Sequence, residues 1–166
     1  METDTKTKVW KACSIEFSIT IQKDQTSETL IAEGRYSEIS ENAQNIIRSL
    51  VPEMAKEDKI MDIELIEFEK KPNEDDVQEE FKKRGLLFPD DLDALRFGAK
   101  YHQMGNLLNK QLRCCVIFPH EKTANSSSKN SMFAICYYGD KKSLGEGEFG
   151  TKWFERWFFA GLRPRQ

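Results

Sequence analysis

Two histidines and four cysteines are the side chains of this chain best suited to nucleophilic or acid–base chemistry. His120 follows Pro119 at the expected end of an apolar strand, where an imidazole next to a loop would serve as a general base. Cys115 lies five residues earlier, and a thiol near a histidine is the arrangement of a cysteine nucleophile. The candidate catalytic residues are therefore His120, Cys115 and the turn residue Asp140. No motif supplies a positioned third member, which favours a non-catalytic protein.

The other cysteines and the second histidine have a structural interpretation. No two cysteines have the CxxC spacing, and they fall mainly within apolar, strand-like runs. We expect buried, reduced thiols in a cytoplasmic protein. His102 lies on the apolar stripe of an expected helix, where a hydrogen-bonded histidine is commoner than a ligand. No group of His, Cys and carboxylate residues has the spacing of metal ligands, so no metal site is expected.

Residues 145–150 read Gly-Glu-Gly-Glu-Phe-Gly and match the pattern G-x-G-x-x-G. Between a strand and a helix, this is the local context of a dinucleotide fingerprint. With Leu144 it also resembles the nucleotide-covering loop of protein kinases over seven residues, which would imply that it covers the phosphates of ATP. Glu146 and Glu148 would repel phosphates, and the chain carries no other kinase element. We interpret the segment as a flexible turn and expect no cofactor. The candidate cofactor contacts are Gly145, Gly147 and Gly150.

Aromatic residues are concentrated near the C-terminus. Trp153 and Trp157, and also Phe154 and Phe158, are four residues apart, which predicts a helix over 152–162. Its apolar arc is wider than one surface helix needs, so it either closes the core or meets a partner. Large aromatic residues and arginine are enriched at interface hot spots. The candidate binding residues are Trp153, Trp157, Phe158, Arg156, Arg163 and Arg165.

The net charge of −3 conceals a segregation of charge. Residues 53–93 contain 15 acidic and 7 basic residues, a net charge of −8, and the rest of the chain carries +5. This balance argues against nonspecific nucleic-acid binding, which needs a basic surface. A third interpretation is nucleic-acid contact through a local basic patch of Lys141, Lys142, Lys152, Arg156, Arg163 and Arg165. Arg163 and Arg165 could instead contact an acidic surface, such as residues 53–93 of a neighbouring subunit. No apolar run reaches the length of a membrane span, so no membrane partner is expected.

Periodicity predicts the elements of the first half. Strict alternation over 9–22 predicts a strand with one buried face, and 29–36 reads as the strand returning from a hairpin. Helical spacing over 39–50 predicts a helix with Ser37 as its N-cap. Residues 60–69 fit either a helix or a strand whose phase is changed by a bulge. We favour the strand.

Two helices follow in the acidic part of the chain. Asn73 and Gly85 are suited to cap the start and end of a helix over 73–84. Asp90 or Asp91 begins the next helix, which should end near residue 105.

The second half predicts strands over 112–118 and 131–138, joined by a polar loop over 119–130. A turn at 139–140 and the glycine-rich turn over 144–150 then lead to the aromatic helix.

Together these elements predict one α+β domain over 9–162, between a flexible segment at 1–8 and a basic tail at 163–166. We expect a mostly antiparallel sheet of about five strands, with helices packed on one face and an aromatic C-terminal helix. No family is recognised.

Without a catalytic constellation, we expect a non-catalytic binding or adaptor module that acts through protein–protein contacts, as a monomer or a homo-oligomer. The alternative is a small enzyme or small-ligand-binding domain with a pocket near His120, the loop at 119–130 and the glycine turn at 145–150.

Overall fold

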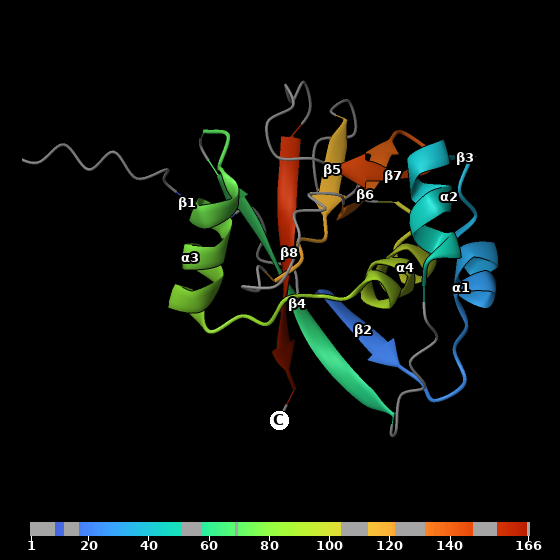
Figure 1. Ribbon diagram of the computed structural model, residues 1–166, viewed down its shortest axis with the longest axis horizontal. Coiled ribbons are helices and arrows are strands. Elements are labelled where there is room, and N and C mark those ends of the chain that lie inside the picture. Colours follow the sequence, from blue (N-terminus) through green and yellow to red (C-terminus); the bar gives the residue numbers. More distant parts are fainter. Residues whose placement is uncertain are drawn as a thin grey trace, which may run out of the picture.

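The computed structural model (Figure 1) describes residues 9–11, 17–50, 58–68, 70–103, 113–121, 132–147 and 156–165. Its helices are α1 (Ser27–Gly34), α2 (Glu41–Arg48), α3 (Glu74–Arg84) and α4 (Asp91–Lys100). Its strands are β1 (Val9–Lys11), β2 (Phe17–Ile21), β3 (Glu38–Ile39), β4 (Lys59–Phe68), β5 (Cys114–Ile117), β6 (Met132–Tyr138), β7 (Lys141–Gly147) and β8 (Arg156–Pro164).

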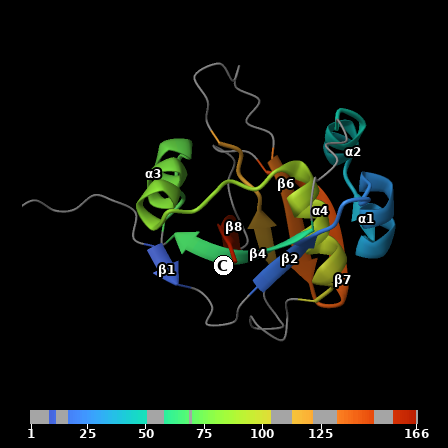
Figure 2. The same cartoon turned by 90° about the horizontal axis from the view of Figure 1, so that it is seen from below.

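These strands form one mixed sheet that curves into a half-barrel (Figures 1 and 2). Its order is β1-β4-β8-β5-β6-β7-β3, and β2 pairs with β4 alongside β1. The pairs β3–β7 and β5–β8 are parallel. The predicted sheet of about five mostly antiparallel strands is therefore wrong. Two strands, β7 and β8, occupy segments that the sequence suggested were a turn and a helix.

Helices cover both faces of the sheet, which corrects the expectation of one covered face. The first core contains Leu30 of α1, Ala43 of α2 and Leu95 of α4. The second core lies on the other face and contains Val77 and Phe81 of α3. Figure 1 accordingly shows α3 well apart from the other three helices.

β8 replaces the aromatic helix that was predicted over 152–162. It lies between β4 and β5 and pairs with both. Phe158 and Leu162 point into the first core, whereas Phe159 and Trp157 pack in the second. A strand buried on both faces carries consecutive apolar residues and loses the alternation that identifies strands. The same run therefore fitted a helix equally well.

The change of phase in β4 has the same origin. Met61, Ile63 and Leu65 lie in the first core, and Ile66 and Phe68 pack in the second. The register with β8 is continuous along the strand, so no bulge interrupts that pairing. The favoured strand is confirmed, and the bulge is not needed.

Two other segments differ from expectation. Residues 29–36 were predicted as a returning strand, but α1 occupies this segment up to Gly34. Thr26 caps this helix, and Leu30 is buried in the first core. Residues 144–150 were predicted as a turn, but β7 continues to Gly147 in register with β6.

The other helices confirm their sequence signals, with small changes at their ends. Ser40, not Ser37, is the N-cap of α2. Asn73 caps α3, and Gly85 ends it in a left-handed conformation with φ of 68°. Asp90 caps α4, which ends before the predicted position. Within the described ranges, no helix combines the length and apolarity needed to span a bilayer.

The open edge of β2 is closed by the end of α4. Phe17, Ile19 and Ile21 are buried in alternation, as predicted for this part of the 9–22 strand. The Tyr101 hydroxyl accepts a hydrogen bond from the Ser18 amide at 2.9 Å and donates to the Ser18 carbonyl at 3.3 Å. A side chain thus substitutes for a further strand at this point.

Candidate functional site

A groove of about 610 Å³ lies beside α3, between that helix and the chain that follows it. We call it the α3 groove. Its lining residues are Asp75, Gln78, Glu79, Lys82, Leu86, Leu87, Phe88 and Glu121.

The apolar side of the groove is shaped by the end of α3. Gly85 takes the left-handed conformation that glycine adopts readily, and the Leu86 amide donates to the Phe81 carbonyl at 2.9 Å. The chain then turns back over the sheet. Leu86 packs onto Gly161, where an added Cβ would lie only 2.7 Å from Leu86 Cδ1.

Leu87 is held outward by its backbone. Its amide and carbonyl both hydrogen-bond to Leu162 of β8, each at 2.9 Å. Leu87 is 51% exposed, and it lines the groove. The neighbouring Phe88 ring packs against Phe81 with centroids 4.7 Å apart. An exposed apolar side chain on a fixed backbone loses little conformational freedom on binding.

The helical side of the groove is fixed to the sheet by ion pairs. Arg84 contacts Glu80 at 2.7 Å and also Glu64 of β4, which pairs with Arg163 of β8 at 3.0 Å. Burial alone would raise the pKa of Glu64, but hydrogen bonds from Arg163 and Arg84 outweigh it and lower that pKa. The carboxylate therefore stays ionised, and α3 is connected to both central strands.

The rim of the groove is mainly acidic. Asp75, Glu79 and Glu121 line it together with a single lysine, Lys82. Charged rims select the sign of a partner's charge and steer its approach.

The structure places His120 next to this groove. The Gln78 side-chain amide donates to the His120 carbonyl at 3.0 Å, and His120 Nε2 lies 2.9 Å from Asp91 Oδ1. The hydrogen bond with Asp91 raises the pKa of His120. The raised pKa shifts the ring towards its protonated form, and the role of His120 as a general base stays a prediction.

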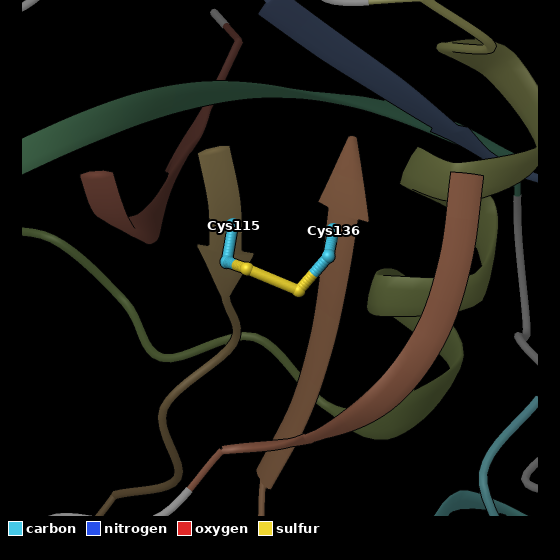
Figure 3. The surroundings of a disulfide bond; sticks show 2 residues. All are labelled: Cys115 and Cys136. Carbon is cyan, nitrogen blue, oxygen red and sulfur yellow. A yellow bond between two sulfur atoms is a disulfide. The ribbon is translucent and has the colours of Figure 1, made fainter. Parts of the chain in front are cut away.

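The other two candidate catalytic residues lie away from His120. Cys115 forms a disulfide with Cys136 on the adjacent strand (Figure 3). Asp140 lies in the turn after β6, and His120 follows β5. Because β5 and β6 are antiparallel, these two residues are at opposite ends of the strand pair. The structure brings together His120 and Asp91, not the predicted trio.

The expectation of reduced thiols is wrong for Cys115 and Cys136. Cys114 is free and buried, and burial raises the pKa of its thiol to about 11. Cys13 lies outside the described residues. Assignment to the cytoplasm was based partly on reduced thiols and stays a prediction.

The described part of the glycine motif, residues 145–147, belongs to strand β7 and not to a turn. Gly145 and Gly147 pair in the β-ladder with Ala134 and Met132. An added Cβ on Gly147 would lie 3.2 Å from Ile117 Cδ1, so close packing explains this glycine. Gly150 lies outside the described residues.

The three arginines among the candidate binding residues have acidic partners within the chain. Arg156 binds Glu67 through two hydrogen bonds of 3.0 and 2.5 Å, and Arg163 binds Glu64 through two more. Arg165 contacts Asp62 at 2.5 Å. These partners belong to the acidic block at 53–93, which the sequence suggested as a surface of a neighbouring subunit. The block meets the arginines within one chain, across β4 and β8.

The aromatic binding candidates are mainly inside the protein. Phe158 is buried in the first core, and Trp157 is partly buried against the second. Trp153 lies outside the described residues. Binding through these side chains stays a prediction.

One buried cation was not found from the sequence. Lys142 Nζ donates to the Gly98 carbonyl, lies 3.2 Å from His102 Nδ1, and sits 4.8 Å from the centre of the Tyr36 ring. Burial lowers the pKa of Lys142 to about 8. These contacts join β7 to α4 and to the chain after α1, which gives Lys142 a structural role. In the described ranges, no three His, Cys, Asp or Glu residues cluster as metal ligands.

The α3 groove was also missed. Its sequence signal is the run Leu86-Leu87-Phe88 between Gly85 and Pro89, three apolar residues in a connection too short for another element. Which of them remains exposed depends on contact with β8.

A scan of protein-family models, a search of curated proteins and a search of solved structures each find no match to this chain.

Proposed function

We propose that the protein is a non-catalytic binding module that acts through protein–protein contacts, and that the α3 groove receives a short apolar segment of the partner. The observation that carries this proposal is the exposed Leu87 side chain on a backbone fixed to β8. Rigid apolar anchors at the centre of a hollow, with polar residues around them, are typical of binding hot spots.

The charge of the groove indicates the charge of the partner segment. Three carboxylates and one lysine line the groove, which favours a segment whose apolar residue is flanked by lysine or arginine. The volume of about 610 Å³ is ample for one or two large side chains.

The backbone hydrogen bonds near the groove support recognition of the partner through its side chains and not by strand pairing. Both polar backbone groups of Leu87 already bond to Leu162, so no partner strand can pair with Leu87. Ser18 on the outer edge of β2 is likewise occupied by Tyr101.

The test is selection of a random displayed peptide library on the folded, full-length chain. We expect enriched peptides that share a large apolar residue beside basic residues. The substitution Leu87→Glu should weaken their binding about 30-fold, which corresponds to about 2 kcal/mol for loss of a hot spot. Isothermal titration calorimetry of one synthetic peptide measures this change.

The matched control is Ile60→Glu, because Ile60 is an exposed apolar residue on β4 that does not line the groove. It should bind the peptide like the unmodified protein. Absence of enriched peptides, or equal weakening by both substitutions, would reject the groove as the binding site. If sedimentation shows self-association that Leu87→Glu abolishes, the partner is a second copy and not a basic peptide.

A further inference from the structure

Cys115 and Cys136 lie directly opposite one another in the antiparallel β5–β6 pair, with Cα atoms 4.1 Å apart (Figure 3). Each strand has a second neighbour, because β5 also pairs with β8 and β6 also pairs with β7. Hydrogen bonds in four adjacent strands therefore hold the two cysteines together whether or not the sulfur–sulfur bond exists. The native fold is compatible with both oxidation states.

The two sulfur-bearing residues differ in access. Cys115 is only 2% exposed and packs in the second core, whereas Cys136 is partly exposed at the edge of that core. Attack on a disulfide requires an approach to one sulfur along the bond, so access decides which sulfur reacts. We propose that this pair is a site of reversible thiol–disulfide exchange, and that thiol reductants from solvent enter at Cys136.

The exchange balances with two thiols as the reductant. A thiolate attacks Cys136 Sγ and forms a mixed disulfide, and the electron pair of the broken bond goes to Cys115 Sγ, which takes a proton. A second thiolate attacks the reductant sulfur of the mixed disulfide. Cys136 then leaves as a thiolate and takes a proton, and the two reductant thiols are oxidised to one disulfide.

The neighbouring Cys114 does not compete for this bond. Successive strand residues point to opposite faces, and Cys114 is buried in the first core while Cys115 packs in the second. Burial also raises the pKa of the Cys114 thiol to about 11, which keeps it protonated. The exchange site therefore consists of Cys115 and Cys136, and Cys114 provides an internal control.

The first measurement is a redox titration of the folded, full-length protein in buffers with stepped ratios of reduced and oxidised glutathione. Free thiols are trapped with a maleimide and assigned by tandem mass spectrometry of the proteolytic peptides, because fragment ions distinguish a label on Cys114 from one on the adjacent Cys115. We expect Cys115 and Cys136 to gain label together at a single midpoint, while the far-ultraviolet circular dichroism spectrum stays unchanged.

Two matched variants test the point of entry. In Cys115→Ser the lone Cys136 should form a mixed disulfide with oxidised glutathione in the folded protein. In Cys136→Ser the lone Cys115 should react at least tenfold more slowly, because it is buried.

Three outcomes would overturn the proposal. The first is a pair that resists excess dithiothreitol until urea unfolds the chain, and the second is a pair that stays reduced in oxidised glutathione. The third is equal reactivity of the two lone cysteines, which would remove Cys136 as the entry point. The first two come from the unmodified protein and do not depend on either variant folding.

Discussion

At the scale of single residues, His120 shows how a contact with a distant part of the chain shifts the pKa of a candidate catalytic side chain. The sequence suggested a general base, but the hydrogen bond to Asp91 stabilises the protonated ring and raises its pKa. The raised pKa shifts the imidazole next to the groove towards its protonated form. No neighbouring sequence pattern indicated Asp91, because it lies 29 residues away in the chain.

This contact predicts a pH-dependent stability. A raised pKa in the folded state contributes stability fully below the unfolded value of about 6.5, and this contribution is lost as the pH rises through the folded value. The free energy of unfolding should therefore fall on Asp91→Asn by more at about pH 6 than at about pH 8.5. Since His120 is 42% exposed, the pH-dependent part should stay below about 1 kcal/mol.

Urea unfolding of both proteins at the two pH values measures that difference. Other titrating groups, including His102 and Asp93, cancel when the two proteins are compared at each pH. A difference that is constant, or that grows towards alkaline pH, would contradict the raised pKa of His120.

At the scale of elements, α3 and α4 begin with the same capping box but differ in burial. Asp76 closes the box of α3 with Asn73, and Asp93 closes that of α4 with Asp90. Asp93 also accepts a hydrogen bond at 2.7 Å from the buried Arg96. Burial raises the pKa of Asp93 to about 6, and the nearby Asp90 charge adds to this shift. The sequence identified both caps but not the buried ion pair.

Substitution of Asp93 and Asp76 should separate the contribution of the buried ion pair from that of the helix cap. Asp93→Ala removes the closer of the two carboxylates that pair with the buried Arg96 and leaves Asp90 at 4.0 Å, so it should lower the free energy of unfolding by about 3 kcal/mol. The matched Asp76→Ala removes only a surface cap and should cost about 1 kcal/mol. Denaturant unfolding at neutral pH measures both. Equal costs would mean that the Asp93–Arg96 pair adds nothing to the cap.

At the scale of the whole molecule, the sheet connects distant parts of the chain. β8 comes from the C-terminal end, yet it lies between β4 and β5 and contributes to both cores. The acidic block and the C-terminal arginines meet on these central strands, which accounts for the segregation of charge along the sequence.

This position predicts that a chain ending at residue 155 does not fold. Without β8, β4 and β5 lose a shared neighbour and both cores lose their central residues, so cooperative thermal unfolding should disappear. Removal of 1–8, which the sequence predicts to be flexible, is the control and should leave the melting temperature unchanged. A folded, cooperative 1–155 chain would show that β8 is dispensable.

Local sequence signals were sufficient to predict an element when only one of its faces is buried, or when a capping residue fixes one of its ends. The alternation in β2, the caps of α3 and α4, and the left-handed Gly85 were all predicted, because each depends on residues within a few positions. Only the tertiary structure decided the conformation of segments that are buried on both faces. β8 and part of β4 are apolar on both faces, which removes the alternation that separates strand from helix. The disulfide, the partner of His120 and the exposure of Leu87 likewise depend on which strands become neighbours, and pairing between distant segments leaves no trace in local spacing.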